Sequence, residues 1–525
     1  MTQYLTVLGI VVVIVAVYAA SRRMGILAPI PLMITGVILG LTPWIDTPGL
    51  DPELILFGFL PPLLFVAAQE FSVPAFRLHM RPILLLAVGL VIFTSLAVGF
   101  ALHAVMPQIP LSAALALGAV VGPPDAVSAI AVARKLGLPR KLVTILEGES
   151  LLNDATALVL LRVAVAAAVG EAVGVGGIAL TAAQSAGGGL LVGLLAGVVI
   201  SFLHRRTLYP LLDNAISLIT PFAAYYGAEL IHGSGVVAVV VTGLYVGHRL
   251  PTMMSAASRL QMAAFWKMVV FMLEGAVFVL VGLHINLIVH DLTEPIHVLV
   301  GLSALVVGIV MVTRFVWIIP AAYLTRLFPN RERNRDSLTY PIVLSWAGMR
   351  GAITLAAALT LPLYLADGVT PFPHRTLLIW LAFVTIMATL LLQGTTLPTL
   401  VRRLKVEQDD PKMDALAEAA VQHEATRAAL VRLEQEITEQ PAPQEVVQRL
   451  RQGATIRANH AWERLGPEEI ETPSDSYRRL RHAMLDTERG VFVSARDEGR
   501  IPDEVLTRVQ RDMDLEESLL GREHG

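Results

Sequence analysis

The stretch of sequence that decides the fold spans residues 146–157 and reads LEGESLLNDATA. It opens an apolar segment that continues to about residue 168, long enough to cross a bilayer as a helix at about 1.5 Å per residue. An ionisable side chain in the middle of a membrane costs about 3 kcal/mol on insertion scales, so Glu149 and Asp154 mark a candidate site. Helical spacing places Ser150 beside Asp154 and Glu149 beside Asn153. We expect the first pair to present oxygen atoms to a small cation and the second to hold the helix against a neighbour.

The composition is typical of a membrane protein with many spans. Of the 525 residues, 55% are hydrophobic and 16% are charged, and the mean hydropathy is +0.64. The absence of cysteine excludes disulfides, zinc–thiolate sites and thiol chemistry. The net charge of −3 gives no indication of a nucleic-acid partner. The first apolar run, residues 4–20, is followed by Arg22 and Arg23 and by no cleavage site, so we interpret it as a retained span.

Thirteen apolar runs are candidate membrane spans. They cover residues 4–20, 26–45, 53–71, 82–106, 110–133, 142–168, 186–203, 210–231, 235–247, 264–288, 296–325, 339–364 and 375–400. Basic residues fall on alternate connections: Arg22/Arg23, Arg77/Arg81, Arg134/Lys135/Arg140/Lys141, Arg205/Arg206, Arg249/Arg259, Arg326/Arg331/Arg333/Arg335 and Arg402/Arg403/Lys405. By the positive-inside rule, this alternation predicts an N-terminus outside and a C-terminus in the cytoplasm. We expect the protein to lie in the plasma membrane. The alternation also predicts an odd number of crossings, about thirteen.

Two of these runs contain helix-breaking centres. Residues 122–125 of the fifth run read GPPD, and the two prolines remove backbone donors and clash with the preceding turn. Residues 348–352 of the twelfth run read GMRGA, in which the glycines permit unwinding. The charge pattern makes these two spans antiparallel, with interruptions at comparable depth. This pattern predicts an inverted repeat with two unwound, crossing helices and a binding site near the membrane midplane.

Two aspartates fall near that midplane. Asp125 lies about fifteen residues into an inward-running span, and Asp154 lies about twelve residues into the outward-running span that follows. A carboxylate removed from water can bind a proton or a hard cation, and hard cations prefer oxygen ligands. Ser150, Asn153 and the carbonyl groups freed by the prolines could complete an oxygen shell for a monovalent cation at Asp154. The alternative for Asp125 is an N-cap of the half-helix that follows the break, and both roles are compatible.

Two arginines in the apolar runs need partners. Arg314 lies in the eleventh run and Arg350 lies at the break of the twelfth, and each should meet a carboxylate or helix C-terminal carbonyl groups. Glu149 is the natural anion, with Arg314 as the first choice of partner and Arg350 as the second. We interpret Glu229 as an interfacial carboxylate. Glu274 fits either a structural pairing or the lining of a vestibule.

After about residue 405 the composition changes. Residues 408–438, 444–464, 474–490 and 502–520 have helical patterns, and Pro441 and Pro443 separate the first two. This region contains no glycine-rich phosphate loop, nucleotide fingerprint or metal-ligand spacing. We therefore expect a transmembrane domain over residues 1–405 and a cytoplasmic helical region over residues 406–525. A regulatory role and a supporting role in dimerisation both remain open for that region.

Several motifs occur together in a characteristic order. They are LPPLLF at 60–65, GPPDA at 122–126, GESLLND at 148–154, Ser234-Gly235 with Ala238 and Gly243, FVLVGL at 278–283, GMRGA at 348–352, and Gln393-Gly394 with Leu397. Each motif is weak alone, but the ordered set is specific. Over residues 5–405 the chain resembles the cation/proton antiporter superfamily, in the branch of the sodium/proton exchangers and close to the bacterial monovalent cation:proton antiporter-1 type.

The resemblance implies a thirteen-helix homodimeric antiporter, in which a dimerisation domain faces a mobile ion-carrying core. It implies that Asp154 carries the cation and the proton and that Asp125 lies at the crossing of the unwound helices. It also implies that Glu149 and Arg314 form a structural pair. Asn153, where some relatives have a second aspartate, is the pattern associated with electroneutral exchange of one proton for one cation. No cofactor and no enzymatic activity are implied.

The chain departs from the family pattern at two positions. Val66 stands where the third-span motif usually has an acidic residue, and Glu70, four residues later, is a weak candidate to replace it. Pro124 replaces a threonine that many relatives have, so cation selectivity is not transferred.

The leading interpretation is exchange of sodium for protons, with lithium or potassium as further substrates. The alternatives are a potassium/proton antiporter and, less favoured, a cation channel that uses the same acidic pathway. A membrane enzyme or a receptor signalling through the C-terminal region is the third reading, and the sequence contains no catalytic motif to support an enzyme.

Overall fold

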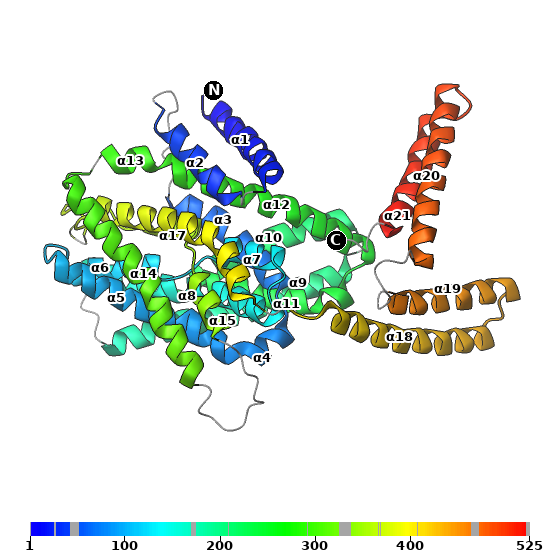
Figure 1. The fold of residues 1–525 in the computed structure, drawn as a ribbon, viewed down its shortest axis with the longest axis horizontal. Coiled ribbons are helices and arrows are strands. Elements are labelled where there is room, and N and C mark those ends of the chain that lie inside the picture. The colour runs from blue at the N-terminus through cyan, green and yellow to red at the C-terminus, as the bar shows by residue number, and fades with distance from the viewer. Residues whose placement is uncertain are drawn as a thin grey trace. The chain divides into compact units, whose positions relative to one another are not determined.

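The computed structural model describes residues 2–25, 28–42, 52–169, 175–207, 209–290, 292–324, 338–365, 367, 369–406, 408–463 and 472–520. The regular structure of these residues is helical, with one isolated β-bridge between Tyr364 and Pro371 (Figure 1). The chain divides into two compact units, Met1–Gln408 and Asp409–Gly525. The arginines predicted on the 326–335 connection lie outside the described residues.

The helices of the first unit follow the apolar runs closely. They are α1 (Thr2–Met24), α2 (Pro29–Gly40), α3 (Pro52–Glu70), α4 (Val73–Leu84), the π-helical η1 (Leu85–Leu90), α5 (Val91–Val105), α6 (Leu111–Val121), α7 (Ala126–Lys135), α8 (Arg140–Val169), α9 (Val175–Arg206), α10 (Pro210–Glu229), α11 (Gly235–Met253), α12 (Ala256–Leu283), α13 (Ile285–His290), α14 (Ile296–Leu324), α15 (Thr339–Trp346), α16 (Ala352–Leu359) and α17 (Arg375–Leu404). Within the described part of the chain, seven helical runs are long and apolar enough to span a membrane, and three shorter apolar helices accompany them. The polytopic all-α prediction is confirmed, whereas the total of thirteen spans stays a prediction.

Both predicted breaks are present. Helix α6 ends at Val121 and α7 begins at Ala126, so the two prolines lie in the non-helical link between them. Helix α15 ends at Trp346 and α16 begins at Ala352. The two links meet, because the amide of Asp125 donates a hydrogen bond to the carbonyl oxygen of Met349 at 2.7 Å. Backbone groups released by one break are therefore satisfied partly by the other, as a low-dielectric interior requires.

Two groups of helices meet in the first unit. The α8 group contains α4–α8 and α14–α17, and within it α8 packs against α4, η1, α6 and α7. The α12 group contains α1–α3 and α9–α12, and within it α12 packs against α1, α2, α3 and α10. Glycines allow a close approach in the second group: Gly36 and Gly282 bring the backbones of α2 and α12 into direct contact. The α2–α12 pair is therefore closely packed along its length beside the α8 group.

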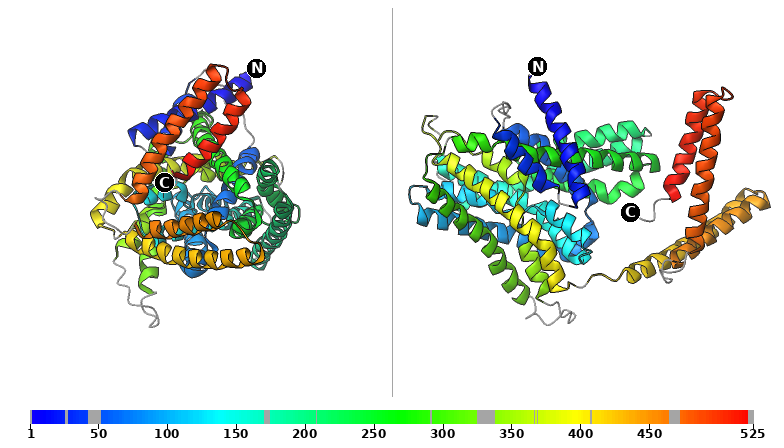
Figure 2. Two further views of the ribbon diagram at one scale, coloured as in Figure 1. Left: turned by 90° about the vertical axis from the view of Figure 1, so that its right-hand side faces the viewer. Right: turned by 45° about the horizontal axis from the view of Figure 1, so that its top comes forward.

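The second unit consists of two helical hairpins. Helix α18 (Pro411–Glu439) runs alongside α19 (Gln444–Glu463), and α20 (Pro473–Asp497) runs alongside α21 (Asp503–Leu520) (Figure 2). These bounds agree with the predicted helical stretches, except that α20 continues seven residues beyond the predicted end at residue 490. Arg481 binds both carboxylate oxygens of Glu516, at 2.6 and 2.8 Å, and this pairing lowers the pKa of the Glu516 carboxyl.

Candidate functional site

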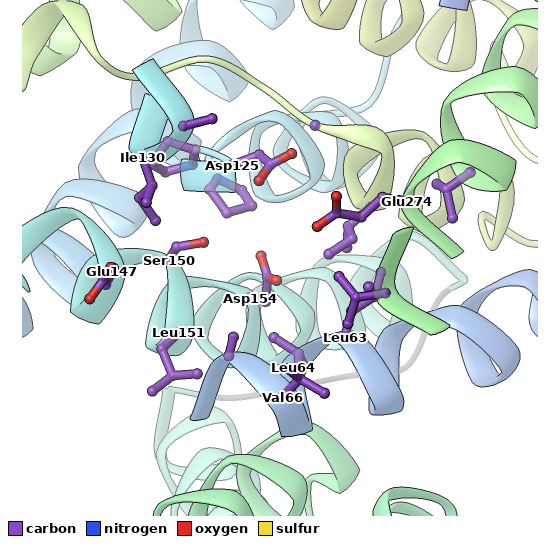
Figure 3. A pocket seen from close by; sticks show the side chains of 18 of the residues that line it. Leu63, Leu64, Val66, Asp125, Ile130, Glu147, Ser150, Leu151, Asp154 and Glu274 are labelled. Atoms are coloured by element: carbon purple, nitrogen blue, oxygen red, sulfur yellow. The ribbon is translucent and has the colours of Figure 1, made fainter. Parts of the chain in front are cut away.

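A cavity of about 350 Å³ lies where the two helix groups meet (Figure 3). One wall comes from α3 and α12, and the other comes from α7, α8, the proline link and the start of α16. Its titratable lining residues are Glu70, Asp125, Arg134, Glu147, Asp154 and Glu274. The cavity therefore collects acidic groups from both sides of the boundary between the helix groups.

Asp154 is the central acid of this cavity. Its side chain is only 8% exposed and its carboxylate points into the hollow, where the Ser150 side chain lies close by (Figure 3). Both residues project from the same face of α8, as their four-residue spacing predicts. Within the described part of the chain, Asp154 has no hydrogen-bond or ion-pair partner. A buried carboxylate without a partner is costly unless it holds a proton or a cation. This position therefore favours binding of a proton or a cation that can be exchanged.

Asp125 reaches the same cavity from the proline link. It directly precedes α7, and its carboxylate lies against Gly351, the residue that precedes α16. An anion near the N-terminus of a helix is stabilised by the helix dipole, and Asp125 is placed beside two such ends. The N-cap position and the cavity position predicted for Asp125 therefore coincide.

The contact with Asp125 leaves no room for a side chain on Gly351. A Cβ atom there would overlap the Cβ, Cγ and Oδ2 atoms of Asp125, so rotation of the carboxylate alone would not relieve the clash. We expect Gly351→Ala to push the two links apart and to lower the exchange rate of reconstituted protein by about tenfold or more. Gly308→Ala on α14 is the matched control, because nothing lies within 4 Å of a Cβ at Gly308. Equal exchange rates for the two variants would show that the Asp125–Gly351 contact does not matter.

Asn153 faces the proline link and does not line the cavity. Its Nδ2 atom donates a hydrogen bond to the carbonyl oxygen of Pro124 at 2.6 Å, and the residue is fully buried. The structure thus places Asn153 on the face of α8 that packs against the proline link, although the sequence also suggested it as an ion ligand. The carbonyl oxygen of Gly122 is also engaged, by Nη1 of Arg350. Two of the carbonyl groups that the break sets free are therefore used to fix the link.

Arg314 is the partner of Glu149. The Nη1 and Nη2 atoms of Arg314 lie 2.6 and 3.2 Å from the two carboxylate oxygens of Glu149, and both side chains are no more than 1% exposed. Arg314 also donates to the carbonyl oxygens of Leu344 and Ser345 at 3.0 and 3.3 Å, at the end of α15. Of the two partners that the sequence allowed for Glu149, the structure selects the first.

Arg350 lies at the C-terminal end of α6, as Arg314 lies at the C-terminal end of α15. Its guanidinium group binds the carbonyl oxygen of Gly122 at the end of α6, and its amide donates to Oγ1 of Thr389 at 3.1 Å. A cation at a helix C-terminus is favourable because unsatisfied carbonyl groups give that end a partial negative charge. The first half of each broken helix thus ends beside a buried arginine. Arg314 is also neutralised by Glu149, whereas Nε and Nη2 of Arg350 have no hydrogen-bond partner among the described residues.

Two ion pairs near the ends of α8 are missing from the sequence-based predictions. Nη2 of Arg134 lies 2.8 Å from Glu147 at the mouth of the cavity. Near the other end of α8, Nη2 of Arg162 lies 2.7 and 2.9 Å from the two oxygens of Glu229 on α10. The signal that could have revealed the second pair is a single arginine, Arg162, in an otherwise apolar stretch that faces the predicted interfacial Glu229.

Comparisons with known proteins agree with this architecture. The family model described as sodium/hydrogen exchanger, transmembrane, matches residues 9–403. An uncharacterized Na(+)/H(+) exchanger of Mycobacterium bovis is 35% identical over 97% of this chain and 96% of the relative, and YjcE of Escherichia coli, also named an uncharacterized Na(+)/H(+) exchanger, is 33% identical over the full length of both chains. The sodium, potassium, lithium and rubidium/H(+) antiporter of Bacillus subtilis is 33% identical over 74% of this chain and 61% of the relative. The sodium proton antiporter MjNhaP1 of Methanocaldococcus jannaschii has a similar fold, with a TM-score of 0.61 at 18% identity over 78% of this chain and all of that chain.

Proposed function

The chain belongs to the sodium/hydrogen exchanger family, and from this premise we propose that it exchanges sodium for protons at Asp154 by alternating access. The observation that carries the proposal is the buried Asp154 carboxylate, which lies in a cavity at the boundary between two helix groups and has no partner among the described residues. One carboxylate can hold either one proton or one monovalent cation. If the α8 group moves only when Asp154 is occupied, exchange of one for the other follows and carries no net charge.

The surroundings of Asp154 suit a small, hard cation. Ser150 supplies a hydroxyl oxygen on the same face of α8, and Asp125 supplies a second carboxylate from the link. Glu149 takes no part in this, because its charge is already neutralised by Arg314. The printed name of the Bacillus subtilis relative includes potassium and lithium, so potassium/proton exchange is the second candidate function.

Exchange in reconstituted vesicles tests the function. Adding sodium outside vesicles with an acidic interior should dissipate the pH gradient, and lithium and potassium measured in the same way rank the cations. Because protons and cations compete for one carboxylate, the apparent Km for sodium should rise as the pH falls. A sodium affinity that stays flat across pH would contradict a shared site. A planar bilayer measurement separates the channel alternative, since a channel would give ohmic current without obligatory proton coupling.

The two ends of α8 support alternating access. Glu147 lies at the open mouth of the cavity, and Arg162 lies fifteen residues further along α8, about 22 Å away at about 1.5 Å per residue. There the pair with Glu229 joins the α8 group to the α12 group. The pair would therefore break when the α8 group moves to open the cavity at that end. The basic residues at the Glu147 end support a cytoplasmic opening there, an external N-terminus and a cytoplasmic C-terminus.

Cross-linking this second end should stop transport. The chain has no cysteine, so Arg162→Cys and Glu229→Cys can be combined without background thiols. We expect a short bifunctional thiol reagent to bring sodium/proton exchange in the double variant down to the level of protein-free vesicles, and a reductant that cleaves the linker to restore it. Each single variant treated with the same reagent is the control. Full exchange in the cross-linked protein would show that this end does not move.

The assembly proposed for the chain is a homodimer in the plasma membrane. A broad apolar face of α9 supports it, because six of its side chains are between 45% and 62% exposed within one chain: Leu190, Leu191, Leu194, Leu195, Val198 and Val199. Such a face must lie against lipid or a second copy. Chemical cross-linking in native membranes, followed by electrophoresis, tests for the dimer.

A further inference from the structure

Glu274 is an intramembrane acid for which the proposed exchange at Asp154 has no role. It lies on α12, and its carboxylate points into the cavity toward the space that Asp125 and Asp154 also face (Figure 3). The acids Glu147, Glu149 and Glu229 each have an arginine partner. Glu274, in contrast, forms no hydrogen bond and no ion pair with any described residue. A structural pairing therefore does not explain it.

Glu274 and Asp154 belong to different helix groups. Asp154 lies on α8, whereas α12 packs mainly against α1, α2, α3 and α10, with a smaller contact to α16 beside the cavity. The residue next to Glu274 strengthens this attachment: Gly275 lies so close to Ile14 of α1 that a Cβ there would be 2.5 Å from the isoleucine Cγ2. If the α8 group moves against the α12 group, Asp154 travels and Glu274 stays. The two carboxylates can then face each other in only one of the two end states.

The two aspartates and Glu274 do not form one closed ion cage. Within the described part of the chain, no three acidic or histidine side chains stand close enough to hold a metal ion together. Asp154 and Glu274 are therefore separate positions on the two walls of the cavity. Glu274 lies on the wall opposite Asp154, and Glu70, also on the α12 group, is exposed at the end of α3. Among the described residues that line the cavity, Arg134 alone is basic, and it is paired with Glu147 at the mouth.

We propose that Glu274 is a stationary loading carboxylate, which receives the monovalent cation from the open side and passes it to Asp154. This inference rests on the proposed exchange at Asp154. It adds that cation loading differs between the two faces of the membrane. The stationary acid raises the local concentration of cations near Asp154 only while the cavity is open at the Arg134–Glu147 end. After the α8 group moves, the cation leaves Asp154 on the other side without passing Glu274.

Side-specific kinetics of Glu274→Gln test this proposal. We expect the apparent Km for sodium to rise about tenfold at the face to which the cavity opens, which is the size expected for losing one charge-assisted contact. At the opposite face the Km should stay within about twofold of the unmodified protein. Everted and right-side-out membrane vesicles present the two faces. Asp367→Asn is the control, because it removes an exposed acid that does not line the cavity and should change neither Km.

Three outcomes decide the proposal. A Km shift at one face supports it, whereas an equal shift at both faces, or no shift at either, overturns it. If Glu274→Gln fails to assemble, Glu274→Ala provides the same comparison, since it also removes the carboxylate and should raise the Km for sodium at the same face only. Asp154→Asn in the same vesicles separates this proposal from the proposed function: exchange that survives in that variant refutes Asp154 as the shared site, whatever Glu274 does.

Discussion

Asp154→Asn abolishes the sodium-dependent dissipation of a pH gradient in reconstituted vesicles: this is the largest functional effect that we expect. Asparagine has nearly the same shape as aspartate, but it can neither release a proton nor neutralise a cation at neutral pH. If one carboxylate binds the proton and the sodium ion in turn, its removal leaves no shared site at which they can be exchanged. The rate should therefore fall to that of protein-free vesicles.

The stability of the same variant is an essential companion measurement. Asp154 has no hydrogen-bond or ion-pair partner among the described residues, so its replacement breaks no such contact and removes a buried charge. We expect the midpoint of thermal unfolding in detergent to stay the same or to rise. A destabilised Asp154→Asn protein would mean that the carboxylate is structural, and full exchange would refute the site itself.

Glu149→Gln should have the opposite signature, with a large loss of stability. The substitution removes the anion that faces Arg314, a fully buried guanidinium group. Breaking a buried ion pair by removing one partner costs about 3–5 kcal/mol. We expect a value near the lower limit, because Arg314 keeps the carbonyl oxygens of Leu344 and Ser345 as acceptors. Thermal unfolding followed by size-exclusion chromatography in detergent measures the loss.

Glu229→Gln is the control for Glu149→Gln. It removes the same chemical group from the pair with Arg162, whose side chains are 47% and 25% exposed, so it should cost no more than about 1 kcal/mol. Both glutamates pair with an arginine, so a large loss of stability in Glu149→Gln and a small one in Glu229→Gln would identify burial as the cause. A Glu149→Gln protein that assembles normally but prefers a different cation would overturn the structural assignment of the pair.

Much of the site could be predicted from local features. The prolines at positions 123 and 124 predict the break between α6 and α7, because proline removes a donor wherever it stands. The four-residue spacing of Ser150 and Asp154 predicts that both face one side of α8, and the structure places both on the cavity. The second break rests on weaker evidence, since glycine permits unwinding without requiring it, yet it is also present.

Other features of the site required the tertiary structure. Two arginines were possible partners of Glu149, and hydropathy cannot choose between them because both lie in apolar runs. Asn153 turns toward the carbonyl oxygen of Pro124 and away from the cavity, which depends on the rotation of α8 about its axis against the link. Arg162 and Glu229 meet although 67 residues separate them along the chain.

The sequence by itself determined that this chain is a polytopic helical exchanger with acids at the depth of two helix breaks. Helix length, proline chemistry and the cost of charge in lipid are local properties, and each is encoded residue by residue. Only the tertiary structure decided which charges are neutralised and which face open space. Lipid and protein interior are equally apolar, so an apolar pattern does not encode the rotation and register of one helix against another. For this reason the difference between Glu149, which is paired, and Asp154 and Glu274, which have no ion pair among the described residues, appears only when the helices are packed.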